Sequence, residues 1–89
     1  MITLEDAKKY LRVDSEDDDE VIKQELNAAE SLVASVLRKD ALGDEDGPIV
    51  VVAVFYAIAY LNEHREEADH HALVITLRNI LFSERKPSF

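Results

Sequence analysis

Three histidines and several carboxylates gather in one polar segment of the sequence. Imidazole and carboxylate groups are common zinc ligands, so this segment could hold a metal ion. The spacing does not match the HExxH arrangement, and the histidines fall on both sides of an expected turn. A polar loop between helices therefore explains the segment better than a metal site does. The residues are His64, His70 and His71 with Glu63, Glu66, Glu67 and Asp69.

A run of acids near the N-terminus invites a calcium interpretation. Asp14, Glu16, Asp18 and Glu25 fall at positions 1, 3, 5 and 12 of an EF-hand count. Position 6 needs glycine for its sharp turn, but Asp19 stands there. Acids at the start of a helix oppose the positive end of its macrodipole, which explains the run without a ligand.

Nucleophilic and phosphate-binding motifs are missing from the sequence. The chain has no cysteine, and its serines and threonines stand in no recognisable catalytic motif. With only two glycines, it also has no glycine-rich phosphate loop. We therefore predict that the protein is not an enzyme and uses no cofactor or metal.

Composition narrows the classes of protein further. The chain has 89 residues, 47% apolar and 33% charged, which fits one small folded domain. Its net charge of −9 argues against binding nucleic acid through phosphates. Residues 1–47 carry six basic and fourteen acidic side chains, so most of the negative charge lies in the first half. No signal peptide is expected, and the longest apolar run, the thirteen residues from Ile49 to Leu61, is too short to span a membrane.

Two helices are predicted in the acidic half of an all-α fold. Thr3 and Asp6 form a capping-box pattern that begins a short helix ending near Leu11. Ser15 is expected to cap a second, long helix whose first turn holds the acids 16–20. Apolar residues recur at spacings of three and four to Leu37, and Arg38 and Lys39 suit a helix C-terminus near Asp40.

Two further helices are predicted in the apolar half. Pro48 suits the first position of a helix that runs through the valine- and alanine-rich segment to Leu61. This segment is apolar on every side, and three other short helices can hardly cover it. We therefore expect part of it to meet another subunit. Leu73, Leu77 and Leu81 mark a fourth helix that ends near Ser83.

The aromatic residues divide into two groups. Five occur at helical core spacing and are predicted to pack in the core: Tyr10, Phe55, Tyr56, Tyr60 and Phe82. Phe89 lies beyond Pro87, which a regular helix cannot include, in a basic tail. It could fold back on its own bundle or anchor a partner's pocket. We accordingly divide the chain into a helical domain, residues 1–83, and a tail, residues 84–89.

The ordered set of motifs resembles the head–tail connector, or adaptor, family of tailed bacteriophages. The resemblance covers nearly the whole chain, although Ala59 stands where many members have Trp. The matching pieces are the opening Leu4–Asp14, the acidic stretch Ser15–Ile22, the alanine-rich Leu26–Glu30, the Pro-led helix Pro48–Tyr60, the Asn62–Arg65 step and the closing Leu77–Arg85.

The resemblance implies a structural protein of the virion, assembled in the host cytoplasm. Such proteins form a ring, expected to be dodecameric, under the portal after DNA packaging, extend the DNA channel and dock the next completion or tail protein. The family's C-terminal segment contacts the portal or a neighbouring subunit. Carried over here, the partner-binding residues are Arg78 on the last helix and Arg85, Lys86 and Phe89 in the tail.

An acidic domain suits a channel wall that DNA must pass without adhering, because like charges release no counterions. We therefore expect Asp17, Asp18 and Asp19 to face the channel or its mouth, with no specific DNA binding. Two other classes remain open. A small acidic regulatory module, of antitoxin or DNA-mimic type, would bind a basic protein as a monomer or dimer. A metal-dependent enzyme would need His70 and His71.

Overall fold

The computed structural model describes residues 2–43 and 46–82, which form four α-helices and no strand. The all-α fold class with four helices is therefore confirmed for this part of the chain. None of its helices is both long and apolar enough to cross a bilayer.

Helix α1, Leu4–Leu11, begins and ends as its sequence predicts. The Asp6 N–H donates to Thr3 Oγ1 at 3.1 Å, and the Thr3 N–H donates to Asp6 Oδ2 at 3.3 Å, which completes the capping box. The helix ends in a Schellman motif, with Arg12 in the left-handed region at φ 60° and the Val13 N–H donating to the Lys8 carbonyl.

Helix α2, Asp19–Val36, is shorter at both ends than predicted. Residues 16–18 precede the helix, because the Asp17 N–H donates to Ser15 Oγ at 3.0 Å in a local turn. At the other end Arg38 adopts φ 59°, which stops the helix before Asp40. Only Asp19 and Glu20 of the acidic run lie in the first turn.

Helix α3, Pro48–Glu63, has Pro48 at its start as predicted. Its alanines and valines let it cross α2 closely, with Ala53, Val54, Ala57 and Ile58 fully buried. The opposite face stays uncovered in the described part of the chain, where Val52 is 52% exposed. The expectation that the three other short helices can hardly cover this segment is confirmed at that face.

Helix α4, His70–Phe82, directly follows Asp69 and has the predicted leucine periodicity. Asp69 Oδ1 accepts the Ala72 N–H at 3.0 Å, and the Asp69 N–H donates to the Tyr60 hydroxyl at 3.0 Å. Leu73, Leu77 and Leu81 are buried against the other helices. Each fully buried leucine contributes about 1.5–3 kcal/mol of stabilisation.

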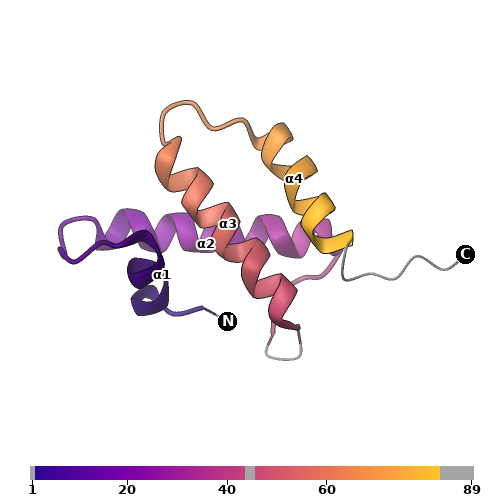
Figure 1. Ribbon diagram of the computed structural model, residues 1–89, viewed down its shortest axis with the longest axis horizontal. Coiled ribbons are helices and arrows are strands. Elements are labelled where there is room, and N and C mark those ends of the chain that lie inside the picture. The colour runs from indigo at the N-terminus through magenta and orange to yellow at the C-terminus, as the bar shows by residue number, and fades with distance from the viewer. Residues whose placement is uncertain (1, 44–45, 83–89) are drawn as a thin grey trace, which may run out of the picture.

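The α2–α3 pair forms the centre of the fold, and the outer helices pack against it separately (Figure 1). Helix α1 contacts α2 and α3, and α4 also contacts both, but α1 and α4 do not contact each other. The two outer helices therefore lie at different ends of α2, with one shared core between them.

The prediction that all five helical aromatics are core residues is wrong for three of them. Tyr10, Tyr56 and Phe82 are 50%, 39% and 58% exposed, whereas Phe55 and Tyr60 are half-buried against the core. Helical periodicity identifies an apolar face but does not say whether this chain supplies enough surface to cover it. These rings form part of the surfaces described next.

Candidate functional site

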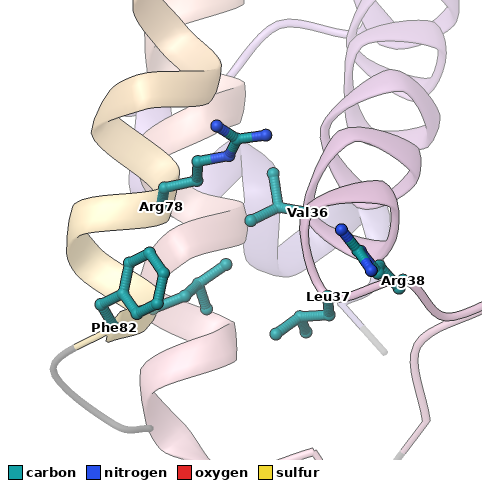
Figure 2. A pocket seen from close by; sticks show the side chains of 6 residues that line it. Val36, Leu37, Arg38, Arg78 and Phe82 are labelled. Atoms are coloured by element: carbon teal, nitrogen blue, oxygen red, sulfur yellow. The ribbon is translucent and has the colours of Figure 1, made fainter. Parts of the chain in front are cut away.

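A notch lies between the C-terminal ends of α2 and α4 (Figure 2). Its space is about 480 Å³, which lies within the range of pockets that enclose a small molecule or a large side chain. We call it the arginine notch. Its lining residues are Val36, Leu37, Arg38, Arg78, Leu81 and Phe82.

The two helices give the arginine notch an apolar floor and a charged rim. Leu81 is only 2% exposed, so the floor belongs to the hydrophobic core. Arg78 and Phe82 are one turn apart on α4, and Figure 2 shows Arg78 reaching from α4 toward Val36. An apolar floor with cationic and aromatic groups at its rim is typical of protein-binding surfaces.

Arg38 enters the arginine notch because of how α2 ends. The Arg38 N–H donates to the Ser35 carbonyl at 3.1 Å, and the Lys39 N–H donates to the Ala34 carbonyl at 2.9 Å. This Schellman motif normally has glycine at the left-handed position. Arginine there costs about 1 kcal/mol of backbone strain, and its side chain lines the α2 side of the arginine notch.

The two arginines of the arginine notch have no ion-pair partner among the described residues, a property that they share with Lys9 and Arg12 but not with the cations that hold the fold together. Neither Arg38 nor Arg78 forms an ion pair with residues 2–43 or 46–82, whereas Arg65 pairs with Glu25 and Lys39 pairs with Asp46. In a chain with nineteen acids and ten bases, intramolecular partners for two arginines are plentiful. Two guanidinium groups therefore stay available for an external acceptor.

A second surface, the aromatic patch, lies where α1 meets α3. We define it by Tyr10, Val52, Phe55 and Tyr56. The rings of Tyr10 and Phe55 stack with centroids 4.6 Å apart and an angle of 20° between their planes. Tyr10 and Val52 are each at least half exposed. Rigid aromatic side chains at a surface are frequent anchors of protein interfaces.

The three aspartates expected to face a channel lie at the start of α2 and differ in their surroundings, with Asp17 and Asp18 before the helix and Asp19 as its first residue. Asp17 is exposed and Asp18 is half-buried. Asp19 Oδ1 lies 2.8 Å from Lys8 Nζ, and this contact raises the pKa of Lys8 above its ordinary value, against the opposing effect of burial. Asp19 thus holds α1 to α2, and Asp17 is the most accessible of the three.

The three histidines do not converge in the structure. The His64 ring stacks on Tyr60 with centroids 4.2 Å apart, and its Nδ1 lies 2.9 Å from the Tyr60 carbonyl. His70 and His71 instead begin α4. Within residues 2–43 and 46–82, no group of three or more histidine or carboxylate side chains is placed to hold a metal ion.

A polar clamp between α2 and α3 has no counterpart in the sequence analysis. Asn62 Nδ2 donates to Glu25 Oε1 at 2.9 Å, and Arg65 Nε donates to Glu25 Oε2 at 3.2 Å. The Asn-x-x-Arg step that carried part of the family resemblance therefore has a structural role here. Its signal was present in the sequence, but Glu25 lies 37 residues away from Asn62.

Of the predicted partner-binding residues, the structure places Arg78 in the arginine notch. Arg85, Lys86 and Phe89 lie outside the described residues. Arg38 was interpreted only as a cation at a helix terminus. The missed signal was a helix that ends with no glycine or asparagine, which forces another residue into the left-handed region.

Comparison with known proteins agrees with the resemblance seen in the sequence. The family model for phage gp6-like head–tail connector protein matches residues 1–84. Searches of curated proteins and of solved structures gave no match. Since the matched region covers nearly the whole chain, this protein belongs to the phage gp6-like head–tail connector family.

Proposed function

We propose that this connector assembles as a ring on the portal after DNA packaging and acts there as a structural adaptor. The ring extends the DNA channel and presents a docking surface to the next completion or tail protein. The family match over residues 1–84 carries this proposal. Two surfaces support it, because the aromatic patch and the arginine notch leave large apolar side chains exposed on a domain of only 89 residues.

Light scattering after size exclusion, with the protein alone and then with the portal of the same phage, tests this role. We expect a ring, or co-elution with the portal that is lost when residues 84–89 are deleted. Loss on deletion would assign portal docking to the tail that contains Arg85, Lys86 and Phe89. A chain that stays monomeric and ignores the portal would contradict the connector role and favour an acidic module that binds a basic protein.

We further propose that Asp17, Asp18 and Asp19, at the start of α2, face the channel or its mouth. Asp17 is exposed, and residues 2–20 carry eight acidic side chains against three basic ones. A negative wall repels the DNA backbone and so lets DNA pass without adhering.

A double variant, Asp17→Asn with Asp18→Asn, tests this placement and leaves the Lys8–Asp19 contact intact. We expect non-specific DNA binding by the ring to rise and DNA ejection to slow. Glu66→Gln with Glu67→Gln is the matched control, since it removes two exposed acids from the α3–α4 connection. Equal effects of the two double variants would show that only net charge matters.

A further inference from the structure

The arginine notch and the aromatic patch differ in character in a way that suits them to each other. The arginine notch offers two guanidinium groups around an apolar floor. The aromatic patch offers an exposed tyrosine ring fixed by stacking on Phe55. Arginine interacts favourably with the faces of aromatic rings, and Tyr, Phe and Arg are enriched in interfaces.

We propose that the arginine notch of one copy receives the Tyr10 end of α1 from the next copy. The occupant is thus a second copy of this chain, bound head to tail. This inference rests on the proposed ring and specifies which surfaces close it. Arg38 and Arg78 flank the incoming Tyr10, and the neighbouring helix α1 packs along Phe82.

Charge complementarity favours a second copy as the partner. The end of the molecule that bears Tyr10 is net negative, because residues 2–20 carry eight acids against three bases, two of which, Lys9 and Arg12, lie beside Tyr10. Asp6 lies one helical turn before Tyr10 and is exposed. Docking this end into the arginine notch supplies external acceptors for both arginines.

The two surfaces lie on different helices at different ends of α2, which suits a head-to-tail contact between copies. Tyr10 is on α1, whereas Arg78 and Phe82 are on α4, and these two helices do not contact each other. When such a contact is not reciprocated within the pair it is heterologous, so each copy keeps one unoccupied surface for a further copy. Repetition of such a contact gives a closed ring when the rotation between copies allows closure.

Complementation between two defective variants tests the pairing directly. Arg78→Glu reverses a charge in the arginine notch and leaves the aromatic patch intact. Tyr10→Ala removes the exposed ring of the aromatic patch and leaves the arginine notch intact. We expect each variant alone to associate at least about tenfold more weakly than the parent, as hot-spot residues do. An equimolar mixture should form one-to-one pairs and nothing larger, because it contains only one intact pairing. Circular dichroism of each variant checks that both remain folded.

A cross-linking experiment maps the same contact without removing it. The described chain holds no free cysteine, and the sequence contains none, so introduced thiols react selectively. Lys9→Cys combined with Asn79→Cys in one chain, treated with a short bis-maleimide on the assembled ring, should give a ladder of covalent multimers. Ser31→Cys combined with Asn79→Cys is the control, because exposed Ser31 lies on α2 outside both surfaces.

The outcomes separate this inference from the proposed function. Rings that form from Arg78→Glu or Tyr10→Ala as readily as from the parent would overturn this interface and leave the ring intact. A ladder of equal strength in the Ser31→Cys control, or multimers from Lys9→Cys alone, would also overturn it. A parent protein that forms no ring on its portal would instead overturn the proposed function.

Discussion

The polar clamp and the arginine notch both place arginines beside α2, yet they have opposite surroundings. In the polar clamp, Glu25 accepts hydrogen bonds from Asn62 and Arg65, so each polar group has a partner within the fold. In the arginine notch, Arg38 and Arg78 form no ion pair with the described residues, and Phe82 is exposed. The difference separates a cation that stabilises the fold, Arg65, from two cations, Arg38 and Arg78, that are available to a partner.

The largest difference in unfolding free energy should lie between substitutions in the floor and in the rim of the arginine notch. Leu81→Ala should lower the free energy of unfolding by about 2–5 kcal/mol, because it leaves a cavity in the core. Phe82→Ala, one residue further along, should cost less, about 1 kcal/mol, because the ring is 58% exposed and leaves no enclosed cavity. Urea unfolding followed by circular dichroism measures both. Equal losses would mean that the rim also belongs to the core.

Removing the acceptor of the polar clamp should have the next largest effect. Glu25→Ala should cost about 1–3 kcal/mol of unfolding free energy, because Asn62 and Arg65 lose charge-assisted hydrogen bonds. Glu25→Gln, which keeps one carbonyl acceptor, should cost less. Arg78→Ala in the arginine notch should change stability by less than about 0.5 kcal/mol. A large loss from Arg78→Ala would contradict the contrast between the two regions.

Arg12 and Arg38, which both adopt the left-handed backbone conformation, allow a matched test. The test asks whether a substitution can raise stability and yet weaken self-association. Arg12→Gly and Arg38→Gly should each raise stability by about 0.5–1 kcal/mol, because glycine relieves the strain at φ near 60°. Arg38→Gly should nevertheless weaken self-association, measured by light scattering. Arg12→Gly removes a cation from the negative end, so its association should be unchanged or tighter. Weaker association in both variants would point to a general effect of helix termination.

The smallest effects should appear as opposite pH dependences at two ion pairs. Contact with Asp19 raises the pKa of Lys8 above its ordinary value of 10.5, so its stabilisation is full below that pH and is lost as pH rises through the raised pKa. Lys39 and the Gly43 N–H lower the pKa of Asp46 below 3.8, so its stabilisation is full above that pH and is lost on acidification. Lys8→Met should therefore converge with the parent in alkali, and Asp46→Asn should converge with it in acid. Urea midpoints across pH test this, and parallel curves would contradict it.

Local signals in the sequence predicted the elements well. Three of these signals depend only on residues close together in the sequence, so long-range packing did not alter them. They are the capping box at Thr3, Pro48 at a helix start and the leucine spacing of the last helix. The ends of the long helix did not follow, because a Ser15 turn and a left-handed Arg38 interrupt a continuous apolar pattern. Such interruptions depend on competing local hydrogen bonds that composition does not reveal.

The sequence predicted only one residue of the candidate site, because several residues around it lie far away in the sequence. Arg78 followed from the family resemblance, but its neighbours Arg38 and Phe82 come together through the packing of α4 against the end of α2. In the polar clamp, Glu25 and Arg65 are likewise far apart in the sequence, separated by 40 positions. Long-range pairings of this kind depend on crossing geometry, which helical periodicity does not specify.

The separation of α1 from α4 has a consequence for how this protein can change over time. Each outer helix rests on the same α2–α3 pair, and neither contacts the other. Substitutions at distant sites without shared partners have nearly additive energetic effects. Within one chain, a substitution on the surface that bears Tyr10 therefore leaves the packing of the surface that bears Arg78 unchanged. Under the proposed pairing these two surfaces meet between copies, so a change in one calls for a compensating change in the other across the interface and not within the fold.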